Sequence, residues 1–249
     1  MATVHIDWKR ALLELATIIA GVLIALAAND WRDSVRDRAE GARYQARLDD
    51  ALGSDLEEYA EAAASAAAVD SAALEVLAVY RGREVPEDRA ADFIADVLKA
   101  SWMPPPAVSA DTYNDLVTTG NLRLLPIALR EGLGAYYAQV KVYQAREEIF
   151  RNRLASGYWS VPAHVLGPDV LPAAWEALAG RTSGEGLDVA RLGVSSGQLR
   201  AMIRRLRAIP EMEPWIADVR HVMVQREVNY GEHLSERARQ VRQVLVGRR

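Results

Sequence analysis

The residues best suited to metal chemistry lie near the carboxyl end, where two histidines stand among glutamates on a predicted helix. The set comprises His221, Glu227, Glu232, His233 and Glu236. Imidazole and carboxylate both bind divalent metals, but the two histidines are 12 residues apart. That separation is about 18 Å along a helix, too far for them to share one ion. The H-E-x-x-H and E-x-x-H spacings are also missing. We therefore expect a solvated, charged helix face and no metal site.

A second candidate is a group of tyrosines around a predicted turn. Tyr136 and Tyr137 are adjacent on one predicted helix, and Tyr113 lies on the helix before it. Between these helices, Gly120 can adopt the left-handed conformation that ends a helix, and Asn121 can cap the helix that follows. A structural helix–turn–helix corner explains the pattern. The alternative is a ligand pocket beneath the turn, lined by the three tyrosines.

Composition argues against several classes of activity. The chain of 249 residues has no cysteine, which removes disulfides, thiolate catalysis and cysteine-based zinc sites. The glycines of residues 180–193 match neither the phosphate-binding nor the dinucleotide-binding motif. We therefore predict no catalytic residue and no cofactor, and expect that the protein is not an enzyme.

Two stretches, residues 200–207 and 237–249, are rich in arginine and could meet phosphates or anionic lipid headgroups. They carry no interleaved aromatic residues, and the net charge of the chain is −4. We interpret them as exposed helix faces and expect no binding to nucleic acid.

The element that dominates the sequence is an apolar run at residues 11–28, with Glu14 as its only charged residue. A membrane-spanning helix needs roughly 17–25 such residues. Trp8 and Trp31 flank the run, about 34 Å apart at helical rise, so each indole can lie at one interface of a bilayer core about 30 Å thick. The run is therefore predicted to be a transmembrane helix after a tail at residues 1–10.

Two other interpretations of the run stay open. Ala25-Leu26-Ala27 resembles a signal-peptide cleavage site, and a soluble protein can bury an apolar helix, although such a helix normally has a polar stripe. The residues predicted at the membrane interfaces are Trp8, Lys9, Arg10, Trp31 and Arg32. Arginines are more numerous after the run than before it, but this rule weakens for long domains, so the membrane side of the large domain stays open.

Small residues line one face of the predicted span. Thr17, Gly21 and Ala25 recur every four residues. Small side chains at this spacing let a second helix approach closely, so this face is a candidate for self-association.

The rest of the chain has helical periodicity and no convincing strand pattern. We predict an all-α fold in which the span continues into a long stalk helix at residues 29–82, with coiled-coil character. This helix is predicted to pack with an irregular antiparallel helical bundle at residues 83–249, and residues 158–195 are expected to form a loop-rich insert because they contain many Gly and Pro residues.

Two segments resemble an uncharacterised family of bacterial single-pass membrane proteins. One pairs a GVLIAL-x-x-N-x-W span with a following helix and an acidic residue: Gly21 to Leu26, Asn29, Trp31, Tyr44, Leu48, Leu52 and Asp55. The other is similar to that family's Y-x-x-L-x-x-x-G-N-L turn and paired tyrosines: Tyr113, Leu116, Gly120, Asn121, Leu122, Tyr136 and Tyr137. The resemblance covers less than a third of the chain and implies a single anchor with a helical domain, and no reaction.

From these observations we expect a non-enzymatic protein anchored in the bacterial cytoplasmic membrane. Its partners would be the lipid bilayer, an unknown protein and a second copy of the chain, contacted through the span and stalk. The role would be protein–protein interaction or scaffolding. The alternative is a membrane-anchored small-molecule sensor with its pocket near the paired tyrosines.

Overall fold

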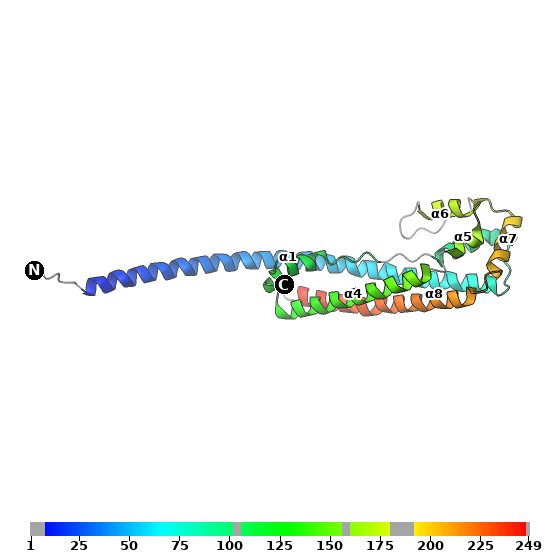
Figure 1. Ribbon diagram of the computed structural model, residues 1–249. Helices are drawn as coiled ribbons and strands as arrows, with labels where there is room; N and C mark the ends of the chain where they lie inside the picture. The colour runs from blue at the N-terminus through cyan, green and yellow to red at the C-terminus, as the bar shows by residue number, and fades with distance from the viewer. Residues whose placement is uncertain (1–7, 102–105, 156–159, 180–191, 248–249) are drawn as a thin grey trace, which may run out of the picture.

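The computed structural model describes residues 8–101, 106–155, 160–179 and 192–247. All regular structure in these ranges is helical, which confirms the predicted all-α class. One long helix runs the whole length of the molecule, and the other helices pack along the half of it farther from the amino terminus (Figure 1).

Helix α1 spans Trp8–Tyr80, a continuous 73 residues, or about 110 Å. No proline interrupts this stretch, and Ala, Leu, Glu and Arg, which favour helix, dominate it. The helix ends where Gly82 adopts a φ of 115° and the Arg83 amide donates to the Ala78 carbonyl oxygen at 2.9 Å. Such a glycine satisfies carbonyls that a helix end otherwise leaves unpaired.

The first part of α1 projects from the bundle as a single helix (Figure 1). Every residue of the stretch 15–36 is exposed, including Ile18, which is 64% exposed, and Ile24, which is 70% exposed. Within the described chain, one helix, α1, is long and apolar enough to cross a membrane, judged by length and composition alone.

From Tyr44 onward, α1 belongs to the bundle. Its buried residues follow steps of three and four: Tyr44, Leu48, Leu52, Asp55, Tyr59, Ala62, Ala66, Val69, Ala73 and Val76. Residues 29–82 were predicted to form a stalk helix packed with a bundle at residues 83–249. In the structure residues 29–36 project, whereas the buried stripe from Tyr44 onward is covered by other helices, most of them distant in sequence.

The carboxyl-terminal third supplies most of that cover. Helix α7 spans Ser196–Arg207, and α8 (Met212–Arg226), the π-helix η4 (Glu227–Leu234) and α9 (Ser235–Val246) form one continuous rod. The rod packs against α1 along α8, η4 and α9. The sequence predicts this rod as a single helix from Trp215 to about Val246, and the π-helical turns within it are not predicted.

The remaining helices join and cover these rods. They are η1 (Glu87–Arg89), α2 (Ala90–Lys99), α3 (Asp111–Thr118), η2 (Asn121–Leu124), α4 (Ile127–Ala155), α5 (Ser160–Leu166) and α6 (Leu171–Ala179). Helices α5 and α6 lie inside the segment predicted to be loop-rich. Their prolines, Pro162 and Pro172, fall in first turns, where the missing N–H breaks no helical bond. Residues 180–191 of the same segment lie outside the described ranges.

Two apolar cores lie one after the other along α1. The core nearer the amino-terminal projection is built from α1, α3, α4, η4 and α9, and it contains Tyr44, Tyr59, Tyr136, Tyr137 and Tyr230. The core at the far end is built from α1, α2, α5, α7 and α8, and its buried members are aliphatic except for Phe93. We call them the proximal core and the distal core.

Candidate functional site

The predicted membrane-interface residues lie at the two ends of the projecting segment of α1. Trp8, Lys9 and Arg10 are helical, and their side chains lie outside the described part of the structure. Trp31 is 70% exposed, and Arg32 is also exposed. These positions are compatible with one aromatic residue at each face of a bilayer.

The small-residue stripe lies on the same segment. Thr17, Gly21 and Ala25 are all exposed, and nothing lies within 4 Å of the position that a Cβ atom would occupy at Gly21. The chain itself therefore leaves space at this face for a second helix.

The three tyrosines proposed to line a pocket come together, but they fill the space between them. The Tyr113 and Tyr137 rings stack at a centroid distance of 4.7 Å, and Tyr136 meets Tyr137 edge-on at the same distance. Tyr136 and Tyr137 are buried. The Tyr137 hydroxyl has no hydrogen-bond partner among the described residues.

Three cavities of 430, 460 and 500 Å³ in the described chain are lined by residues outside this trio of tyrosines. The packing of the rings thus gives the sensor interpretation no support.

A buried carboxylate anchors the tyrosine cluster to α1. The Tyr136 hydroxyl donates to the Asp55 carboxylate at 2.6 Å, and the Tyr59 and Tyr136 hydroxyl oxygens are 2.8 Å apart. When Asp55 is ionised, the Tyr136 hydroxyl hydrogen lies in the bond to Asp55, so the Tyr59 hydroxyl donates to the Tyr136 oxygen. Asp55 is only 3% exposed, and its burial raises the pKa of the carboxyl to about 6 despite the opposing effect of the Tyr136 hydrogen bond. Asp55 can therefore change its charge near neutral pH.

A second set of buried polar side chains lies next to the set formed by Asp55, Tyr59 and Tyr136. The Tyr230 hydroxyl donates to Glu147 at 2.8 Å, and Arg226 Nε lies 2.7 Å from the other oxygen of that carboxylate. Arg226 is 3% exposed, and its guanidinium lies 5.8 Å from the centre of the Tyr230 ring. Tyr230 stacks on Tyr59 at 5.5 Å, so the two polar groups form one continuous cluster across α1, α4 and the α8–η4 rod.

The π-helix η4 positions this second group. It places Tyr230 in the proximal core, and the Ser235 hydroxyl donates to the Tyr230 carbonyl oxygen at 2.7 Å. At Gly231, a Cβ atom would lie 3.3 Å from that of Ala63 on α1, so the two helices approach closely here. Widened helical turns of this kind are frequent at functional sites.

Sequence reasoning missed most of this cluster. Asp55 appeared only within the family resemblance, without a role, although it occupies a core position between Leu52 and Tyr59. Arg226 and Tyr230 were passed over in a segment interpreted as a charged face. That interpretation is confirmed for the five histidine and glutamate residues considered there, all of which are exposed. Nothing local distinguishes Arg226 from them, because its burial depends on Glu147, 79 residues earlier.

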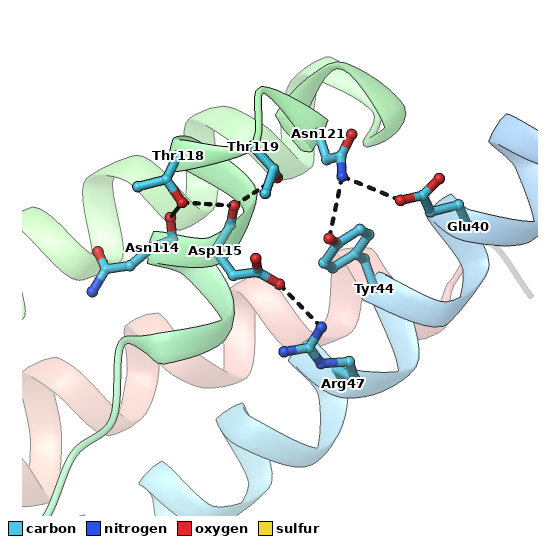
Figure 2. A network of polar contacts seen from close by, with 8 residues as sticks. All are labelled: Glu40, Tyr44, Arg47, Asn114, Asp115, Thr118, Thr119 and Asn121. Atoms are coloured by element: carbon cyan, nitrogen blue, oxygen red, sulfur yellow. Dashed lines mark hydrogen bonds and ion pairs between the residues drawn. The ribbon is translucent and has the colours of Figure 1, made fainter.

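The turn after α3 is a structural corner attached to α1 (Figure 2). Gly120 has the expected positive φ of 73°. The Asn121 side chain donates to Glu40 and to the Tyr44 hydroxyl, both at 3.2 Å, and Arg47 pairs with Asp115 at 3.1 Å. The corner thus fixes the start of the bundle at the base of the projecting segment.

Some arginines of the two basic stretches, residues 200–207 and 237–249, hold helices of the bundle together. Arg207 donates to the carbonyl oxygens of Val79 and Arg83 at the end of α1, and Arg242 pairs with Asp49 at 2.6 Å. Arg200 and Arg204 are exposed on one face of α7. Residues 248–249 lie outside the described ranges.

The chain was expected to contain no G-x-S-x-G motif, and that expectation is wrong. Residues 193–197 match the G-x-S-x-G pattern of some hydrolases, in which the serine sits in a strained turn. Ser195 instead has an ordinary extended backbone, and it forms a reciprocal capping box with Gln198 at the start of α7. The sequence predicts that Ser195 or Ser196 caps this helix, and the structure assigns the cap to Ser195, which does not sit in the strained turn of the hydrolase motif.

No protein-family model, curated protein or solved structure matches the chain. The buried polar cluster joins three helices away from solvent, which is the arrangement expected of groups that fix a unique packing. The feature that the fold leaves unexplained is the uncovered apolar segment of α1.

Proposed function

We propose that the protein is a non-enzymatic, single-pass membrane protein of the bacterial cytoplasmic membrane, whose helical bundle serves protein–protein interaction or scaffolding. The observation that carries the proposal is the exposure of the apolar residues of α1 between Leu15 and Ala28. The family resemblance noted above supports the same proposal.

The free-energy cost of exposing apolar side chains to water supports the proposed membrane anchor. Ile18, Ile19, Val22, Leu23, Ile24 and Leu26 are between 49% and 70% exposed. Burying one such side chain fully is worth about 1.5–3 kcal/mol. In water this segment would be a large apolar patch, of a kind that marks a membrane or protein contact. A bilayer core covers it on all sides, as a helix that is apolar all round requires.

For the polar cluster, a non-enzymatic role is supported by where its ionisable groups lie. Asp55 and Glu147, the carboxylates of the polar cluster, are buried and bonded to tyrosines. The cavity beside Glu147 and Arg226 has a volume of about 20 Å³, which accommodates about one water molecule. A substrate could not reach these carboxylates without separation of the helices.

The scaffold role is tested by site-specific photocrosslinking of the full chain in native membranes. Crosslinkers at Ile127, Ile149 and Arg204 sample the near end, the middle and the far end of the bundle, and all three positions are exposed. We expect adducts with a different protein from at least one position and none from a buried control position, Leu133. Adducts with only lipid or the same chain at all three positions would contradict a scaffold for other proteins.

A further inference from the structure

Three of the arginines that follow the span share one helix face. At 100° per residue, Arg32, Arg36 and Arg43 fall within an arc of about 40°. Glu40 and Asp33 lie roughly 40° and 60° from that arc, and Asp37 lies roughly 100° from it, where it pairs with Arg123 of η2 at 3.0 Å. The arginines thus form one basic flank of α1, although the segment as a whole is nearly neutral.

The basic flank has no anionic partner within the described chain. Arg32, Arg36 and Arg43 are exposed, and none forms an ion pair with a described carboxylate. Arg36 and Arg43, together with Glu40, Tyr44 and Arg47, line an open groove of about 430 Å³. Glu40 accepts a hydrogen bond from Asn121 and Arg47 is paired with Asp115, so Arg32, Arg36 and Arg43 are the arginines of this flank without an ion pair.

The position of the flank along α1 selects its ligand. Measured from Ala28, the last apolar residue, Arg32 lies about 6 Å and Arg36 about 12 Å farther along the axis, and Arg43 about 22 Å. The polar layer on each side of a bilayer core is about 5–8 Å deep. Helical side chains lean toward the amino terminus, which here is toward the bilayer. Arg32 and Arg36 can therefore reach the headgroup phosphates, and Arg43 lies above them.

We propose that Arg32 and Arg36 bind the headgroup phosphates of anionic phospholipids in the leaflet where Trp31 lies, with Arg43 adding positive potential above them. The guanidinium group presents paired donors that match a phosphate. The inference rests on the proposed anchor, since the span brings these residues to the lipid surface. It adds a lipid preference that an apolar span alone does not have.

The test uses the full chain reconstituted in phosphatidylcholine vesicles with a trace of spin-labelled lipid. Electron paramagnetic resonance then measures the fraction of label immobilised by the protein, for phosphatidylglycerol and for phosphatidylcholine. We expect a preference for phosphatidylglycerol of roughly five-fold for each arginine at the surface, decreasing as salt is raised. Arg32→Gln with Arg36→Gln should abolish most of it, and Arg43→Gln should reduce it less than either single change.

Arg200→Gln is the matched control. Arg200 is also exposed and also has no carboxylate partner in the described chain, but it lies on α7 at the far end of the bundle. Its substitution should leave the preference unchanged. An equal loss for Arg200→Gln, or no preference in the unaltered protein, would overturn the inference. Displacement of the labelled lipid by millimolar glycerol phosphate would instead assign the flank to a soluble anion and overturn the lipid assignment.

Flotation of the vesicles separates this inference from the anchor on which it rests. If the chain does not float with vesicles of either composition, the anchor fails and the lipid site fails with it. If it floats with both and immobilises the two lipids equally, the anchor stands and only the lipid site fails. Unchanged helical circular dichroism in each variant shows that the fold is intact.

Discussion

Helix α1 has two halves that share one backbone and have opposite surroundings. Between Leu15 and Ala28 it is apolar on every side and exposed. From Tyr44 to Val79 it is apolar along one stripe, and that stripe is buried under the other helices. A helix with one apolar stripe is covered by its own fold, whereas a helix apolar on all sides needs a solvent that is apolar on all sides. This difference is the one expected if α1 passes from lipid into the bundle, as we propose.

The largest effect is expected in the buried half, at the ion pair of the polar cluster. Arg226→Ala leaves Glu147 buried without its cation, and removing one partner of a buried pair costs about 3–5 kcal/mol. The measurement is the free energy of unfolding of the full chain in detergent micelles, from urea titration. Arg226→Met combined with Glu147→Leu should recover most of the loss. A change of less than about 1 kcal/mol in the single variant would show that the pair is not a buried determinant of stability.

The two halves can be compared directly with the same substitution. Leu52 is fully buried and Leu23 is 60% exposed. Leu52→Ala should lower the free energy of unfolding of the bundle by about 2–5 kcal/mol, whereas Leu23→Ala should change it by less than about 0.5 kcal/mol. Equal effects of the two variants in the same urea titration would mean that the projecting segment is part of the folded core.

The proximal core should respond to pH through Asp55. The folded-state pKa of about 6 lies above the ordinary value of 3.8, so the folded protein holds this proton more tightly than the unfolded chain. Stability should therefore fall as pH rises from about 4 to 6, by roughly 2–3 kcal/mol, and stay level above that range.

Asp55→Asn removes this contribution and keeps an acceptor for Tyr136. The difference in unfolding free energy between the unaltered protein and the variant isolates Asp55, because Asp96, whose pKa burial also raises to about 6, is present in both proteins. A difference that does not change between pH 4 and pH 7 would contradict the raised pKa.

The smallest effect is expected in the exposed half, where the face formed by Thr17, Gly21 and Ala25 is a candidate for self-association. Gly21→Ile should lower the dimer fraction in micelles a few-fold, because a large side chain separates helices that pack through small residues. Ala16→Ile, about 140° away around the helix, is the matched control. Dimer fractions from analytical ultracentrifugation that are equal for both variants would remove this face as the contact.

The parts of the fold that could be predicted from sequence depend on local signals. The helix from Trp31 to Tyr80 follows from periodicity without proline, and the Gly120 turn follows from the need for a positive φ. A serine cap at Ser195 or Ser196 follows from the position of the serines before the periodic segment. The exposure of Ile18 and Ile24 agrees with an apolar run that has no polar stripe.

The parts that could not be predicted depend on contacts between distant segments. The stripe from Tyr44 to Val76 was predicted to belong to a stalk helix packed with the bundle. Which helices cover it could not be predicted, because α8 to α9 lie more than 130 residues later. The π-helix η4 widens where Tyr230 meets Glu147, a pairing that no local pattern contains. For the same reason, the tyrosines could be grouped from sequence, whereas their packing against each other could not.

The claim that residues 11–28 of α1 lie in a lipid bilayer is tested most directly by extracting cell membranes with alkaline carbonate and floating them on a density gradient. The full chain should float with the membranes, and mass spectrometry should find its amino terminus uncut. Release into the soluble fraction, or a chain that begins after Ala27, would contradict the anchor.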